Sequence, residues 1–230
     1  MALATRRLVY SDIQSLSAGF AEFAAATLRD TLTQKPKATL VVPGGSTPRH
    51  YLPALAQCSL PWDRITVTLS DERWVDVDDP QSNENLVCQY LLAHLPVPTT
   101  FVGLKTQHTD PFTALDDIHQ RLSHISLPPD LTVLGLGEDG HIASLFPGSQ
   151  PETALSRHCV ATAPPIAPSL RVSLSLDLLA SSDHIALVVT GDHKRRLLDR
   201  LEERLDMKLP VSWLVKLASP RITVFETDAA

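Results

Sequence analysis

The pairing of His141 with Asp139, two residues earlier, suits this sequence to acid–base chemistry. Both residues belong to a glycine-rich segment, GLGEDGH at 135–141, that directly follows an apolar run. A carboxylate beside an imidazole fixes which ring nitrogen carries the proton. Such a pair can take a proton from water and return it to a leaving oxygen. We predict that His141 and Asp139 are catalytic; the alternatives are a purely structural loop histidine and a role for Glu138 in place of Asp139.

The same segment formally matches G-x-G-x-x-G, the pattern of dinucleotide-binding loops. The match fails physically, because Glu138 and Asp139 place two carboxylates where a pyrophosphate has to approach. Pro147 also cuts short any helix after the loop, and no second strand ends in an acidic residue about 20 residues further on. The sequence therefore predicts a glycine-hinged loop that presents Asp139 and His141 in place of a dinucleotide-binding loop.

A second glycine-rich segment, GGSTP at 44–48, has the composition of a phosphate-binding turn. Glycines let backbone N–H groups approach an anion closely, and a helix N-terminus adds free N–H groups and partial positive charge. Thr47 suits the N-cap and Pro48 the first helical position. We predict phosphate binding by Gly44, Gly45, Ser46 and Thr47; the alternative is a plain tight turn. The Gly-Lys-Ser/Thr ending of a nucleoside triphosphate loop is missing.

Three cations and one carboxylate complete the candidate binding site. The triplet Asp71-Glu72-Arg73 directly follows an apolar run, so Arg73 is expected to pair with phosphate and Asp71 with sugar hydroxyls. Lys194 falls in the first turn of an expected helix, where a bound anion compensates its unfavourable charge. Arg171 is a further candidate. Taken alone, the acidic-basic triplet is more often solvated surface charge, and the alternative for Lys194, which precedes two arginines, is an exposed lysine.

Apolar runs alternate with helical periodicity along the chain, which predicts a parallel sheet covered on both faces. Strands are expected at 8–10, 38–42, 65–69, 131–134, 185–189 and 222–225, with an alternating, half-exposed strand at 172–176. Helices are expected after a Ser11 cap, from Pro48 to about 58, and at 82–95, 112–125 and 197–205. The proline-rich run at 163–168 is expected to be a loop.

The candidate residues follow strands that end at 42, 69, 134 and 189. Parallel strands present those ends at one edge, where ligands of open α/β sheets bind. We therefore predict one α/β domain over residues 1–230, three-layered, with a mainly parallel, Rossmann-like sheet flanked by helices, and one cleft that all four segments share.

Composition narrows the function classes. The 230 residues are 43% hydrophobic and carry a formal net charge of −6, which argues against nucleic acid or an anionic membrane as a partner. Three widely spaced cysteines indicate a reducing compartment, and no apolar run approaches the length of a membrane span. We expect a cytoplasmic protein. The histidines form no convincing ligand set, so no metal site is predicted.

At these residues the sequence resembles the 6-phosphogluconolactonase family, within the wider glucosamine-6-phosphate isomerase/deaminase-like superfamily. The matching motifs are PGGSTP at 43–48, SDER at 70–73 with SN at 82–83, GLGEDGH at 135–141 with ASLFPG at 143–148, RVSL at 171–174 and GDHK at 191–194. The resemblance implies hydrolysis of 6-phospho-D-glucono-1,5-lactone to 6-phospho-D-gluconate without a cofactor, in the oxidative pentose phosphate pathway. It also implies a monomer or small homo-oligomer with a phosphorylated sugar lactone as its small-molecule partner.

Carried over by position, the resemblance implies that His141 is the base and Asp139 its supporting carboxylate. It places Gly44, Gly45, Ser46, Thr47, Arg73, Arg171 and Lys194 around the phosphate or sugar. Ile142 and the pair Ser212-Trp213 depart from the family pattern and put the shape of the pocket edge in question. A glucosamine-6-phosphate deaminase and a non-catalytic sugar-phosphate-binding effector domain are the alternatives. The deaminase pattern has a Glu soon after the histidine, which is missing here, and no space precedes the first strand for a DNA-binding motif.

Overall fold

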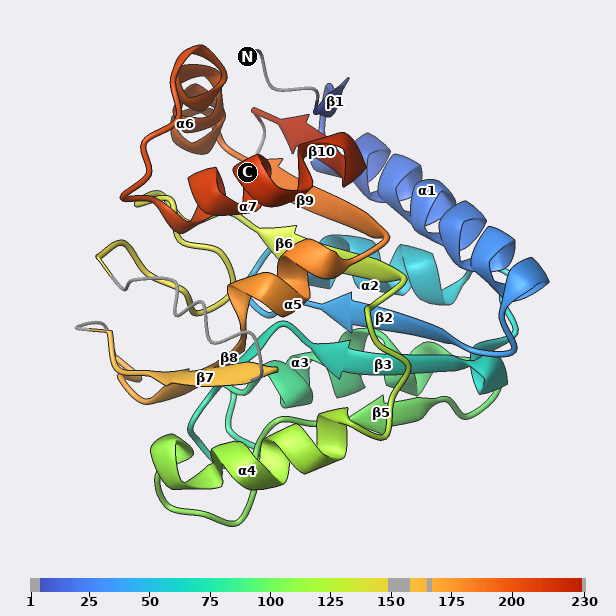
Figure 1. Cartoon of the computed structure of the whole chain (residues 1–230). Helices are drawn as coiled ribbons and strands as arrows, with labels where there is room; N and C mark the ends of the chain where they lie inside the picture. Colours follow the sequence, from blue (N-terminus) through green and yellow to red (C-terminus); the bar gives the residue numbers. More distant parts are fainter. Residues whose placement is uncertain (1–4, 149–157, 165–166, 229–230) are drawn as a thin grey trace.

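The computed structural model describes residues 5–148, 158–164 and 167–228. A seven-stranded sheet, ordered β1-β10-β9-β6-β2-β3-β5, forms its centre, and every neighbouring pair in it is parallel (Figure 1). The predicted mainly parallel α/β fold is thereby confirmed. The strands are β1 Arg6–Tyr10, β2 Ala38–Val42, β3 Ile65–Leu69, β5 Thr100–Val102, β6 Leu131–Gly135, β9 His184–Thr190 and β10 Ile222–Thr227.

Helices cover both faces of this sheet and make the outer layers. The α1 and α2 helices pack against each other on one face, whereas α5 and α7 pack together on the opposite face (Figure 1). The helices are α1 Ile13–Gln34, α2 Pro48–Ala56, α3 Asn83–Tyr90, α4 Pro111–Leu122, α5 Leu176–Ser181, α6 Asp192–Glu203 and α7 Pro210–Ala218; single 3₁₀ turns lie at Trp62–Arg64, Leu92–His94 and Ser219–Arg221. None of the helices in the described residues is long and apolar enough to cross a membrane.

A second, antiparallel sheet of three strands lies beyond the carboxyl ends of the central strands (Figure 1). It consists of β4 Asp71–Arg73, β8 Arg171–Leu174 and β7 Cys159–Thr162, in that order. The expected half-exposed strand at 172–176 is wrong in two respects. All four residues of β8 are buried, and Ser175 ends the extended segment because its side chain caps α5.

The ends of α1 follow ordinary capping chemistry, although the cap differs by one residue from the expectation. Asp12, not Ser11, is the N-cap, because its carboxylate accepts a hydrogen bond from the Ser15 backbone N–H at 2.8 Å. The helix ends at Gln34, just before Pro36, as predicted. Leu205 lies outside α6, which ends at Glu203. The loop expected at 163–168 is irregular where it is described; residues 165–166 lie outside the described residues.

The four strand ends that precede the candidate site residues all belong to the central sheet. The β2 and β3 strands end level, with Val42 beside Leu69, and β6 and β9 are in register with Gly135 beside Val188. The strands β2 and β3 are buried throughout, as strands covered on both faces must be. Segments far apart in sequence therefore meet at one edge of the sheet, as predicted.

Phe20 packs α1 against the sheet, and replacing it tests whether this part of the core is assigned correctly. The side chain is fully buried, with ring centroids 4.4 Å from Tyr51 and 5.7 Å from Phe225. Phe20→Ala is expected to lower the free energy of unfolding by about 3–5 kcal/mol, measured by urea denaturation. Phe112→Ala is the matched control, because Phe112 is 51% exposed and its loss should change stability by less than about 0.5 kcal/mol. Equal losses would contradict the assigned core.

Candidate active site

A cavity of about 380 Å³ opens at the carboxyl edge of the sheet, where the predicted segments meet. Nine of the ten predicted site residues line it, and the tenth, Asp139, is hydrogen-bonded to one of the nine. The predicted residues that line the cavity are Gly44, Gly45, Ser46, Thr47, Asp71, Arg73, His141, Arg171 and Lys194. They come from the β2–α2 turn, the small sheet, the loop after β6 and the first turn of α6.

The turn between β2 and α2 has the backbone of an anion-binding loop. Gly45 adopts φ of +102°, a conformation that side chains with a Cβ rarely adopt. A Cβ on Gly44 would lie 1.7 Å from the Asn83 side-chain oxygen, so this close approach requires glycine. Thr47 precedes α2, but its side chain makes no capping hydrogen bond and its hydroxyl instead lies 3.3 Å from that of Thr190. The first turn of α2 therefore faces the cavity.

His141 and Asp139 form a hydrogen-bonded pair at the cavity wall. The distance between His141 Nδ1 and Asp139 Oδ1 is 2.6 Å, and the His141 backbone N–H donates to the same oxygen at 3.1 Å. Because a carboxylate oxygen accepts, Nδ1 carries the proton and Nε2 keeps its lone pair. A Cβ on Gly137 would lie 2.1 Å from His141 Nδ1, so glycine at this position makes room for the ring. This arrangement suits a general base.

Phe146 packs on the outer side of this imidazole, with ring centroids 4.7 Å apart. The Arg171 guanidinium lies over the same phenyl ring, 5.5 Å from its centroid. The motif gave Phe146 no role of its own, and its contact with Arg171 could not be predicted because β8 comes from a distant part of the chain. The aromatic ring thus brings the candidate base and a cation into one neighbourhood.

Arg73 and Arg171 are direct cross-strand neighbours in the β4–β8 pair. Like charges in this position repel each other, and the proximity of Arg73 together with burial lowers the pKa of Arg171, burial being the larger cause. Arg73 donates one hydrogen bond to the Gln81 carbonyl oxygen at 2.7 Å, whereas its buried Nε has no partner among the described residues. An anion in the cavity would relieve this concentration of positive charge.

Asp71 is buried, and it lines the cavity as predicted. Ser70 Oγ donates to its Oδ1 at 2.9 Å, and Ser144 Oγ donates to its Oδ2 at 2.7 Å. Both serines are fully buried, so the carboxylate is held in a fixed orientation. Each oxygen retains a second lone pair that can accept a hydrogen bond from a sugar hydroxyl.

Asn83 is a cavity residue that the prediction of the site left out. It is 1% exposed, and its Nδ2 donates to the Asp71 carbonyl oxygen at 2.8 Å. The sequence signal was the SN pair at 82–83, which is among the motifs that match the family. Ser82 is the cap of α3, since its hydroxyl accepts from the Asn85 N–H at 3.1 Å. The amide next to it supports Gly44 and Asp71.

The two departures from the family pattern lie away from the described cavity lining. Ile142 is fully buried in the core, and Trp213 donates its indole N–H to the Met207 carbonyl oxygen at 2.7 Å. Ser212, beside it, is fully buried. Among the residues that the structure describes, no group of three or more histidine, cysteine or acidic side chains is arranged to hold a metal ion.

Comparison with known proteins gives matches over most of the chain. Residues 11–223 match the family described as glucosamine-6-phosphate isomerases/6-phosphogluconolactonase. A 6-phosphogluconolactonase of Pseudomonas putida is 39% identical over 190 residues, which cover 80% of this chain and 78% of that protein. A 6-phosphogluconolactonase of Neisseria meningitidis serogroup A is 32% identical over 229 residues, covering 95% and 97%. The crystal structure of a 6-phosphogluconolactonase from Shewanella baltica matches over 100% of both chains, with 31% identity and a TM-score of 0.88.

The chain belongs to the glucosamine-6-phosphate isomerase/6-phosphogluconolactonase family. Within that family, the relatives named above are all 6-phosphogluconolactonases, and the resemblance noted from the motifs is confirmed.

Glu72 lies between the candidate site residues Asp71 and Arg73, and its burial predicts that stability depends on pH. Burial raises the pKa of its carboxyl group to about 7, although the N–H groups of Asn83, Glu84 and Arg73 act against this rise. An unfolded glutamate ionises near pKa ~4.3. The folded state therefore holds the proton more tightly, and this contribution to stability is present below about pH 4 and lost as the pH rises to 7.

We expect the free energy of unfolding of the wild type, relative to Glu72→Gln, to fall by roughly 1 kcal/mol per pH unit between pH 5 and 7 and then to level off. Urea denaturation at pH 5, 6, 7 and 8 measures this difference. Glu203→Gln is the control, because Glu203 is exposed on α6. A difference that does not change with pH would mean that Glu72 stays ionised throughout.

Proposed function

We propose that this protein hydrolyses 6-phospho-D-glucono-1,5-lactone to 6-phospho-D-gluconate by general-base activation of water. The observation that carries the proposal is that one cavity joins the His141–Asp139 pair to a glycine loop and three cations. The names of the relatives, 6-phosphogluconolactonase in each case, support the same reaction. We assign the protein to the cytoplasm, because sparse free cysteines suit a reducing compartment. From the resemblance to the family we also propose that it is a monomer or small homo-oligomer.

Phosphate binding comes first in the proposed mechanism. The phosphate group docks on the Gly44–Thr47 turn, where N–H groups at the start of α2 face the cavity. Lys194 and Arg73, which line the same cavity, neutralise its charge. This docking holds the distant lactone carbonyl near His141 and replaces a bimolecular encounter with a positioned one.

His141 then acts as the base through Nε2. It removes a proton from water as the water oxygen attacks C1 of the lactone, and Asp139 stabilises the imidazolium that forms. Bond formation at C1 converts the carbonyl oxygen to an oxyanion. When the C1–ring-oxygen bond breaks, the imidazolium returns its proton to the departing ring oxygen, and the open-chain acid is released.

Arg171 is the donor that we assign to the oxyanion. The loop at 137–140 offers backbone N–H groups nearby, but Gly137 donates to the His141 carbonyl oxygen at 2.9 Å and Gly140 donates to that of Gly137 at 3.0 Å. Arg171 shares the Phe146 ring with His141 and lines the same cavity. A fixed cation at the site of developing charge stabilises the transition state more than the substrate.

The reaction itself is tested by acid release at neutral pH from fresh 6-phosphogluconolactone, corrected for spontaneous hydrolysis. Enzyme-dependent release is expected from the phosphorylated lactone and far less from unphosphorylated gluconolactone, because the cavity cations have no phosphate to bind in the second compound. Equal rates with both would contradict the phosphate anchor. No acceleration with either would contradict the proposed reaction, and a glucosamine-6-phosphate deaminase assay would follow.

His141→Gln tests the base. We expect the turnover number to fall by about 10²–10⁴, with little change in KM, because the variant keeps the fold and the phosphate contacts. His184→Gln is the matched control, since His184 is exposed at the opposite end of β9 from the cavity. Near-wild-type turnover of His141→Gln at saturating substrate would contradict the assignment.

A further inference from the structure

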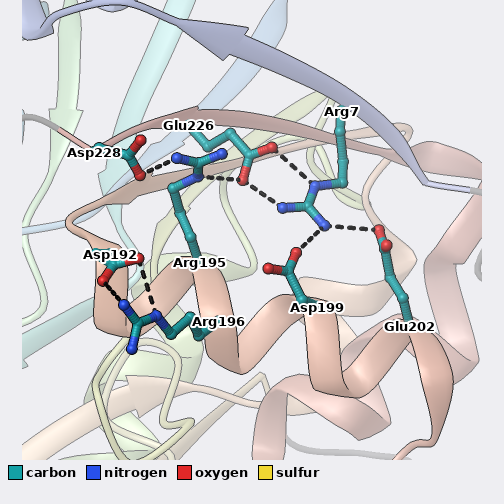
Figure 2. Close-up of polar contacts among 8 residues, drawn as sticks. All are labelled: Arg7, Asp192, Arg195, Arg196, Asp199, Glu202, Glu226 and Asp228. Carbon is teal, nitrogen blue, oxygen red and sulfur yellow. Dashed lines mark hydrogen bonds and ion pairs between the residues drawn. The ribbon is translucent and has the colours of Figure 1, made fainter.

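Lys194 lines the cavity from α6, a helix that buries only a few apolar side chains. The buried residues of α6 are Leu197, Leu198 and Leu201, and most of the others are charged. Three leucines alone leave the rotation of a helix loosely specified, because apolar contact is not directional. A second set of contacts, made by charged groups, joins α6 to the edge of the sheet (Figure 2).

The centre of these contacts is Glu226 in β10, whose side chain is 1% exposed. Arg7 from β1 donates to both of its carboxylate oxygens, with Nε to Oε1 at 2.9 Å and a terminal nitrogen to Oε2 at 2.6 Å. Arg195 from α6 donates to Oε2 at 3.3 Å. Figure 2 shows the carboxylate between the two guanidinium groups. A buried carboxylate is tolerated only when it is paired in this way.

The same arginine of β1 also reaches two acidic residues of α6. Arg7 lies 2.7 Å from Asp199 and 3.1 Å from Glu202. Arg195, Asp199 and Glu202 are spaced by four and three residues, so they share one face of the helix. That face is held against Arg7 and Glu226, as Figure 2 shows. Lys194 precedes Arg195 by one residue, which is about 100° around the helix.

The turn before α6 is tied to the same strand. The Gly191 N–H donates to the carbonyl oxygen of Thr227, the residue after Glu226, at 2.9 Å. Gly191 adopts φ of +93°, which redirects the chain from β9 into the helix. Contacts with β10 therefore fix both the position where α6 starts and the rotation of the helix about its axis.

From these contacts we infer that Glu226 is a positioning residue for Lys194: together with Arg7 and Arg195 it fixes the rotation of α6 that points Lys194 into the cavity. The inference rests on the proposed role of Lys194 in phosphate binding. Loss of the carboxylate removes the buried group that Arg7 and Arg195 share, although Arg7 keeps Asp199 and Glu202 and Arg195 keeps the more exposed Asp228. The rotation of α6 is then less closely fixed, so Lys194 spends less time at the phosphate. Substrate affinity falls while the chemistry at His141 is unchanged.

The experiment compares Glu226→Gln and Arg195→Gln with the wild type, each alone and combined with Lys194→Met. We expect Lys194→Met to raise KM for the phosphorylated lactone at least about tenfold, and each network variant to raise it at least about threefold, with turnover within about twofold of wild type. In the Lys194→Met background the network variants should add less than about twofold. Arg195→Lys, which keeps the charge, should restore part of the affinity.

Arg196→Gln is the matched control on the same helix. Arg196 is 73% exposed and pairs with Asp192 within α6, away from Glu226 in Figure 2, so its loss should leave KM unchanged. Unphosphorylated gluconolactone supplies a substrate control, because the network variants should not alter its kcat/KM. Arg195→Gln retains the Arg7–Glu226 pair and serves if Glu226→Gln does not fold.

Titration calorimetry with inorganic phosphate, for the same variants, separates this inference from the proposed reaction. Weaker phosphate binding that depends on Lys194, without lactone hydrolysis by the wild type, would sustain the positioning role and refute the reaction. Hydrolysis by the wild type with unchanged KM and phosphate affinity in the network variants would overturn the positioning role alone. An equal rise in KM with and without Lys194 would also overturn it.

Discussion

The site depends on the parallel pairing of the central strands. Parallel pairing requires every connection to cross over and return to the starting edge, so every strand ends on the same side. The β2–α2 turn, the loop after β6 and the start of α6 consequently share that side, although 42 and 190 are far apart in the chain. None of these segments carries the whole chemistry. The backbone hydrogen bonds of the sheet bring the candidate base, the glycine turn and the candidate cations to one cavity.

Electrostatics then distinguishes this edge from an ordinary sheet edge. The small antiparallel sheet sets Arg73 opposite Arg171, and Lys194 adds a third cation to the same cavity. A protein with a net charge of −6 thus concentrates positive charge in one place. Asp71, held by two buried serines, balances part of it without filling the cavity. The repulsion among these cations would be relieved by an anionic ligand.

Short sequence patterns were sufficient to predict the strands and turns that are determined by neighbouring residues. The bounds of β2 and β3 matched because each is a short, mainly apolar run followed at once by proline or serine. Most of the predicted cavity residues were found because they follow such runs, whereas Asn83, which does not, was left out of the prediction. Non-local pairings were not predictable: β4 is three polar residues whose partner strand, β8, lies about a hundred residues away, and Ser175 turns the expected alternating strand into a helix. The Arg7–Glu226 contact joins opposite ends of the chain and leaves no signature in either segment.

The candidate base and the candidate anchor differ in how much of the protein they need. Asp139, Gly137 and His141 lie within five consecutive residues, so the base keeps its orientation as long as one loop persists. The candidate phosphate anchor is shared among β4, the β2–α2 turn and α6, and it exists only while these three elements stay docked. Substitutions in the outer layers therefore change the affinity for a ligand before they change proton transfer at His141. Evolution of this fold can retune which phosphorylated compound is retained while the hydrolytic loop is inherited intact.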